Sequence, residues 1–190
     1  MRIIAGRYKG RTLKGPSAPG VRPTSDRLRE TLFNVVDVEV PDCRVLDGFA
    51  GTGAVGLEAL SRGAAHVTFV ERDRLAAAVV EQNVAACGAG DRCIIVRDDF
   101  VGVARRLGGT APFDLVLLDP PYDFPDTEAV LVDAAALLKP GGLVVLEHAR
   151  RREPPSGAPA LGVRRRMVAG DSQLTFYAHS GPQVPAPPVD

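Results

Sequence analysis

The stretch "VLDGFAGTGAVG", Val45 to Gly56, decides how the rest of the chain is interpreted. It opens with an apolar run that ends at an acid, passes through a glycine-rich loop and continues with helical character. Gly51, Gly53 and Gly56 satisfy the spacing G-x-G-x-x-G. This spacing is typical of the turn between the first strand and the first helix of a nucleotide-binding α/β fold, although a plain tight turn produces it too.

Strand-like and helix-like segments alternate on both sides of this loop. Short runs rich in valine, isoleucine and leucine predict strands at 43–48, 66–71, 92–99, 113–119 and 141–148, with helices at 53–63, 72–88, 101–109 and 127–138. Such alternation predicts a doubly wound, Rossmann-like α/β sheet that is mostly parallel. Residues 161–179 break the rhythm and predict a hairpin that turns at Gly170–Asp171 and adds one antiparallel strand.

The two ends of the chain differ from its middle. Residues 1–31 hold eight lysines and arginines against two acids, although the net charge of all 190 residues is zero. We expect a basic N-terminal β-hairpin arm over 1–20, an α/β domain over 21–180 that begins with a helix after Pro23, and a proline-rich disordered tail over 181–190.

The composition excludes several protein classes. No apolar run approaches the roughly 18 residues of a membrane span, and the first residues lack the apolar core of a signal peptide, so we expect a cytoplasmic protein with no membrane partner. Cys43, Cys87 and Cys93 form no C-x-x-C pair, which argues against a disulfide framework and a zinc site. We expect no metal.

Two carboxylates favour one cofactor over another. Asp47 ends the first strand ahead of the loop, where it would repel a pyrophosphate but suit a cationic ligand, and Glu71 ends the next strand, where ribose hydroxyls bind. S-adenosyl-L-methionine combines two cationic groups with a ribose and no pyrophosphate, so we predict it, with S-adenosyl-L-homocysteine as product, over a nicotinamide cofactor. After the third strand, Asp98 or Asp99 is expected at the adenine amino group and Phe100 on the ring, although an aspartate there also suits a helix N-cap. The predicted cofactor-binding residues are Asp47, Gly48, Phe49, Ala50, Gly51, Thr52, Gly53, Glu71, Arg72, Asp98, Asp99 and Phe100.

A second motif ends the fourth strand, at Asp119-Pro120-Pro121-Tyr122. Ligands of an open α/β sheet bind at the carboxyl ends of its strands, near the switch point of the topology, so this turn is expected to face Asp47. It resembles the catalytic motif of amino methyltransferases. The Asp119 carboxylate and the Pro120 carbonyl could each accept a hydrogen bond from one of the two N–H groups of an amino group. Pro121 could stiffen the turn, and Tyr122 could stack on a flat target.

The resemblance extends to one family. "RIIAGRYKGRTL", "RPTSDRLRETLFNVV", "LDGFAGTGAVGLEALSRGA" and "VLLDPPYDF" together are similar to the RsmD-type 16S rRNA (guanine-N2) methyltransferases. The chain departs from the family pattern at Gly48, where a larger apolar residue is usual, and at Thr52, where serine is usual. Gly48 is expected to loosen the loop.

The resemblance implies a substrate and a partner. The expected reaction is direct methyl transfer to N2 of guanine 966 of 16S rRNA, in an assembling small ribosomal subunit, by a monomeric enzyme. The residues expected at the RNA are Arg2, Arg7, Lys9, Arg11, Lys14, Arg22, Thr24, Arg27 and Arg29. N6-adenine methylation of DNA or RNA, methylation of a protein glutamine, and a non-catalytic RNA-binding module remain as alternatives.

Overall fold

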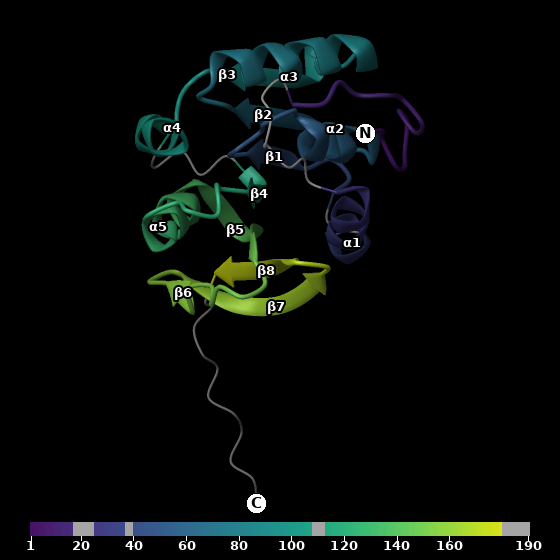
Figure 1. The fold of residues 1–190 in the computed structure, drawn as a ribbon. Helices are drawn as coiled ribbons and strands as arrows, with labels where there is room; N and C mark the ends of the chain where they lie inside the picture. The colour runs from purple at the N-terminus through teal and green to yellow at the C-terminus, as the bar shows by residue number, and fades with distance from the viewer. Residues whose placement is uncertain (17–24, 37–39, 108–112, 180–190) are drawn as a thin grey trace, which may run out of the picture.

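A computed structural model describes residues 1–16, 25–36, 40–107 and 113–179, and its centre is an eight-stranded sheet of order β3-β2-β1-β4-β5-β8-β7-β6 (Figure 1). The first five strands in that order are parallel, which confirms the predicted Rossmann-like sheet. The strands are β1 Arg44–Asp47, β2 His66–Val70, β3 Cys93–Val96, β4 Phe113–Leu118, β5 Leu138–Ala149, β6 Gly157–Ala158, β7 Leu161–Ala169 and β8 Ser172–His179.

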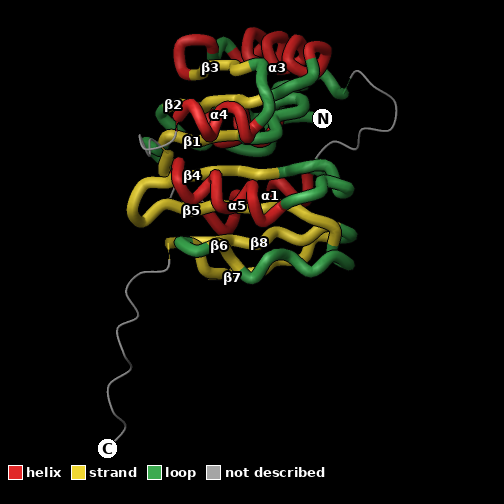
Figure 2. The backbone as a smooth tube through the Cα atoms, turned by 90° about the vertical axis from the view of Figure 1, so that its left-hand side faces the viewer, coloured by secondary structure: helices red, strands yellow, loops and turns green. Residues whose placement is uncertain are grey.

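Helices cover both faces of the sheet, which therefore forms the middle layer of three (Figures 1 and 2). α1 and α2 lie on one face, and α4 and α5 lie on the other. Each face has its own apolar cluster, one around Phe33 and Phe69 and one around Phe100 and Phe113. The helices are α1 Asp26–Val36, α2 Ala54–Ser61, α3 Arg74–Cys87, α4 Phe100–Leu107 and α5 Thr127–Leu137, with a short 3-10 turn at Gly90–Arg92.

The C-terminal hairpin enters the sheet as predicted. β8 lies between β5 and β7 and is antiparallel to both, and the hairpin turns at Gly170–Asp171. Two details escaped the sequence pattern. β5 begins at Leu138, directly after α5. β6 has only two residues, which are too few to produce a recognisable periodicity in the sequence.

The first described residues form a short hairpin, as the sequence predicts. Residues 1–3 pair with residues 10–13 through an antiparallel bridge between Arg2 and Thr12, and the Leu13 amide donates to the Met1 carbonyl at 3.0 Å. The hairpin also bonds to α2: the amides of Ile4 and Ala5 donate to the Glu58 carboxylate at 2.8 and 3.0 Å, and the Tyr8 amide donates to Ser61 Oγ at 2.9 Å. The described part of the arm, residues 1–16, is thus packed against the α/β domain.

No helix in the described ranges is long and apolar enough to cross a bilayer. The predicted tail, 181–190, lies outside the described residues.

Candidate active site

The acidic residues of the two motifs meet at one edge of the sheet. β1 lies between β2 and β4, and the backbone register places Asp47 beside Phe69 of β2 and Leu117 of β4. Glu71 and Asp119, each one residue past the end of its strand, therefore flank Asp47. The expected meeting of the glycine loop and the proline turn at the carboxyl ends of β1 and β4 is present.

Three side chains hold the glycine loop. The Gly51 amide donates to Glu71 Oε2 at 2.8 Å, and the Gly56 amide donates to Asp47 Oδ2 at 3.0 Å. From α3, Asn83 Nδ2 donates to the Thr52 carbonyl at 2.9 Å. Asn83 is 1% exposed and had no signal in the sequence. The loop is therefore fixed by its own protein groups, with two of the predicted cofactor carboxylates as anchors.

Asp47 is a buried acid with an unusual proton affinity. Burial raises its pKa to about 7; the hydrogen bond from Gly56 opposes that rise, and the negative charges of Asp119 and Glu71 add to it. Ionised Asp47 is thus costly in the protein alone, and a cation placed beside it would be stabilising.

An aromatic cluster supports the loop and corrects two expectations. Phe49 stacks on Phe100 with ring centroids 5.6 Å apart and meets Phe124 edge-on at the same distance. Phe100 is only 2% exposed, so its ring supports Phe49 and is not available to an adenine, contrary to the expectation. A Cβ atom at Gly48 would lie 2.7 Å from Phe100 Cδ2 and 3.0 Å from Leu118 Cδ2. Gly48 therefore permits close packing and does not loosen the loop.

The remaining predicted cofactor residues lie around the same edge. Asp99 Oδ1 accepts a hydrogen bond from the Gly102 amide at 2.7 Å near the start of α4, as a helix N-cap residue does. This contact matches the N-cap role that the sequence left as the alternative to adenine binding. Asp98 pairs with Arg106, a contact that lowers the pKa of Asp98. Arg72 is exposed, and the Thr52 hydroxyl lies 3.5 Å from Met1 Sδ, facing the N-terminal segment.

The proline turn is compact and presents one aromatic ring. Pro120 is buried, Asp119 is half-buried, and the Phe124 amide closes the turn on the Pro121 carbonyl at 2.8 Å. Tyr122 is 44% exposed, and its hydroxyl lies 3.0 Å from Ser172 Oγ at the start of β8. The tether at the hydroxyl restrains the ring while nearly half of the residue stays accessible.

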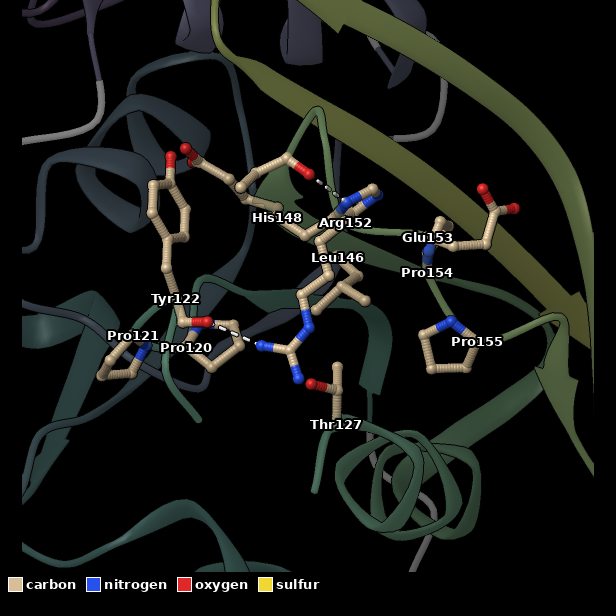
Figure 3. A pocket seen from close by; sticks show the side chains of 12 residues that line it. Pro120, Pro121, Tyr122, Thr127, Leu146, His148, Arg152, Glu153, Pro154 and Pro155 are labelled. Carbon is tan, nitrogen blue, oxygen red and sulfur yellow. Dashed lines mark hydrogen bonds between the residues drawn. The ribbon is translucent and has the colours of Figure 1, made fainter. Parts of the chain in front are cut away.

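Arg152, which the sequence did not single out, clamps this turn (Figure 3). Its Nη1 donates to the Tyr122 carbonyl at 2.6 Å, and its Nη2 donates to the Phe124 carbonyl at 3.3 Å. A pocket lies beside the clamp, between the turn and the segment that follows β5. Its lining includes Pro120, Tyr122, Glu147, His148, Arg152 and Pro155. An arginine in a loop has no sequence signal for such a contact, because it depends on the loop's path.

Most of the predicted RNA-contacting residues are on the surface, with one exception. Arg2, Arg7, Lys9, Arg11, Lys14 and Arg27 are exposed, and Arg92 joins Arg7 and Arg11 around the Tyr8 ring. Arg29 is completely buried: its Nη2 donates to Asp26 and to the Arg2 carbonyl, both at 2.7 Å. A buried guanidinium cannot reach RNA, so the assignment of Arg29 is corrected. Arg22 and Thr24 lie outside the described residues.

Comparisons with known proteins agree with this arrangement. The pattern of the family described as conserved hypothetical protein 95 matches residues 1–178. The chain is 36% identical over 183 residues to ribosomal RNA small subunit methyltransferase D of Escherichia coli K12, covering 93% of this chain and 89% of that protein. The Haemophilus influenzae protein of the same name is 37% identical over 150 residues, covering 77% and 78%. The solved structure of Escherichia coli yhhF, described provisionally as a methyltransferase, superposes with a TM-score of 0.81 at 34% identity, covering 94% and 97% of the two chains.

Proposed function

The chain belongs to the conserved hypothetical protein 95 family, that of the RsmD-type methyltransferases, and from this premise we propose that it methylates N2 of guanine 966 in 16S rRNA. The observation that carries the proposal is the position of the Asp119-Pro120-Pro121-Tyr122 turn beside the anchored glycine loop, on neighbouring strands. S-adenosyl-L-methionine is the proposed cofactor and would supply an electrophilic methyl group. The proposed substrate is the RNA of an assembling small subunit, and the enzyme is proposed to act as a monomer.

The residues around the glycine loop fit this cofactor. Asp47 is a buried acid whose charge a cationic ligand would stabilise. Gly51 has a φ of +55°, and no atom beyond its immediate chain neighbours lies within 4 Å of the place where its Cβ would be, so the backbone is open to a ligand there. Glu71 accepts one hydrogen bond on each oxygen from the protein and, as a carboxylate, has further lone pairs for ribose hydroxyls. Phe49, backed by Phe100, replaces Phe100 as the aromatic residue proposed near the adenine.

The proline turn supplies the groups that an amino nucleophile needs. The lone pair of an exocyclic amino group is delocalised into its ring, which makes the nitrogen a poor nucleophile. In the proposed mechanism the Asp119 carboxylate and the Pro120 carbonyl accept hydrogen bonds from the two N–H groups of the amino group and stabilise the positive charge that grows on its nitrogen. The exposed ring of Tyr122 stacks on the guanine, which must first leave its own stack.

A methylation assay with labelled cofactor tests the substrate class. The expected result is incorporation into 16S rRNA, naked or in small-subunit particles, with the label mapping to N2 of guanine 966. Incorporation only into DNA would support the N6-adenine alternative, and incorporation only into protein would support glutamine methylation. Binding of RNA without incorporation into any acceptor would support the non-catalytic module.

Two substitutions in the same turn test the mechanism. Asp119→Ala is expected to lower kcat by at least about 100-fold, because an oriented electrostatic group in a transition state is worth on the order of 2.7–4 kcal/mol. Cofactor affinity, measured by calorimetry, is expected to remain measurable. The matched control is Asp123→Ala, which removes an exposed carboxylate from the same turn and is expected to leave kcat near that of the wild type. Equal turnover in Asp119→Ala and the wild type would contradict the role given to Asp119.

A further inference from the structure

Three arginines gather around one buried tyrosine of the N-terminal hairpin. The guanidinium carbons of Arg7, Arg11 and Arg92 lie 6.0, 5.9 and 5.6 Å from the centre of the Tyr8 ring. Arg92 Nη2 also bonds to the Tyr8 hydroxyl, across 84 positions of the sequence. We name Arg7, Arg11 and Arg92 the arginine cluster. Arg92 has no signal in the sequence, because only the folded chain brings it to the hairpin.

The arginine cluster carries an unbalanced positive charge. Within the described ranges, none of its three guanidinium groups forms an ion pair with a carboxylate. Arg11 donates instead to the Ala86 carbonyl in the last turn of α3, and Arg92 bonds to a phenol, so both partners are neutral. Arg7 and Arg11 are exposed, and Arg92 is half-buried. Like charges held this close repel one another, and an anion placed among them would be stabilising.

The arginine cluster lies at the opposite edge of the sheet from the reacting groups. Arg92 directly precedes β3, whereas Asp119 directly follows β4, and these strands belong to the parallel part of the sheet. Two strands, β2 and β1, separate β3 from β4, which corresponds to about 14 Å across the sheet. The four residues of β3 add about 13 Å along the strands. The cluster and Asp119 are therefore too far apart to contact the same nucleotide.

A line of cations connects the arginine cluster with the glycine loop. The Lys14 amide donates at 2.7 Å to Oδ1 of Asn83, the α3 residue that also anchors the loop. Ala86, which accepts from Arg11, lies about one helical turn further along α3, and Arg92 follows the end of that helix. Figure 1 shows the N-terminal segment running beside α2 and α3. The exposed Lys14 and Arg11 thus lie between the loop and the far edge of the sheet.

We propose that the arginine cluster binds backbone phosphates of the RNA substrate several nucleotides away from the target guanine; the choice of RNA as the partner rests on the function proposed above. Arginine suits this ligand because its planar guanidinium can donate two parallel hydrogen bonds to phosphate oxygens. Such contacts position an RNA without reading its sequence. In this arrangement the RNA strand follows the hairpin from the edge that holds the glycine loop to the opposite edge.

A competing role for the arginine cluster is attachment of the hairpin to the α/β domain. The bond from Arg92 to Tyr8 and the bond from Arg11 to Ala86 both serve that purpose. Attachment does not explain Arg7, whose guanidinium contacts the Tyr8 ring and makes no hydrogen bond within the described residues. It also does not explain why three cations meet without an acid. The two roles predict different effects for variants that change charge and variants that change only the contact.

The test measures the binding of a labelled uridine homopolymer by anisotropy over a range of salt concentrations. Arg7→Gln with Arg92→Gln is expected to reduce the slope of log Kd against log salt by about 1, because about 0.7 of a counterion is released per phosphate contact on a single strand. Arg7→Gln alone removes no hydrogen bond and is expected to shift the slope in the same direction. Tyr8→Phe removes the hydroxyl contact but keeps every charge, and it is expected to retain the wild-type slope. Arg105→Gln with Arg165→Gln, at exposed positions of α4 and β7, removes the same charge elsewhere and is expected to retain that slope too.

Several outcomes would overturn the inference. A wild-type slope in the Arg7/Arg92 variant would refute it. A loss in Tyr8→Phe as large as in that variant would assign the cluster to hairpin attachment, and an equal loss in the Arg105/Arg165 variant would show only a general effect of net charge. The function is tested separately: a wild-type protein that methylates no 16S rRNA contradicts the proposed function, while a reduced slope in the Arg7/Arg92 variant would still support RNA binding at the cluster.

Discussion

Replacement of Asp47 by asparagine is expected to change how the stability of the protein depends on pH. Burial raises the pKa of Asp47 from an ordinary value of 3.8 to about 7, so the folded state holds this proton more tightly than the unfolded chain. The stabilisation from this group is complete below about pH 4 and is lost as the pH rises through about 7. A shift of about three units corresponds to about 4 kcal/mol over the whole range, of which about 3 kcal/mol falls between pH 5 and pH 8.

Urea unfolding of the cofactor-free protein at pH 5 and pH 8 measures this difference. Asparagine keeps an oxygen that can accept from the Gly56 amide but cannot ionise. The free energy of unfolding of Asp47→Asn minus that of the wild type is expected to be about 3 kcal/mol larger at pH 8 than at pH 5, which means that the variant gains stability relative to the wild type as the pH rises. Asp91→Asn, at an exposed position, serves as the control and is expected to follow the wild type. If Asp47→Asn differs from the wild type by the same amount at both pH values, the burial argument is wrong.

Two further substitutions test the packing of the loop and the support of the turn. Gly48→Ala is expected to lower the free energy of unfolding by about 1–3 kcal/mol in urea titrations, because the added methyl group would crowd Phe100 and Leu118. Gly90→Ala, which has open space around its Cβ, is the control and is expected to lower the free energy of unfolding less; equal losses would contradict the packing account. Arg152→Met is expected to reduce kcat at least about tenfold with cofactor affinity unchanged, because it removes both bonds to the turn and lets its groups shift. Arg105→Met, at an exposed position of α4, is the control, and a full-rate Arg152→Met enzyme would show that the clamp is dispensable.

Local patterns predicted the order of the elements and the two motifs. Short apolar runs between helical segments indicated the parallel strands, because buried strands and amphipathic helices leave different periodicities in a sequence. The place of the glycine loop and the proline turn followed from a general rule about the carboxyl ends of parallel strands, and that rule required no knowledge of side-chain packing.

The tertiary structure decided which side chains are buried and what they contact. Arg27 and Arg29 look alike in the sequence, but one is exposed and the other fills the interior beside Asp26. Phe100 was expected on the surface of the site and instead supports Phe49, while Arg152 was unremarked and holds the turn. These roles depend on contacts between residues far apart in the chain, and such contacts exist only once the sheet has assembled.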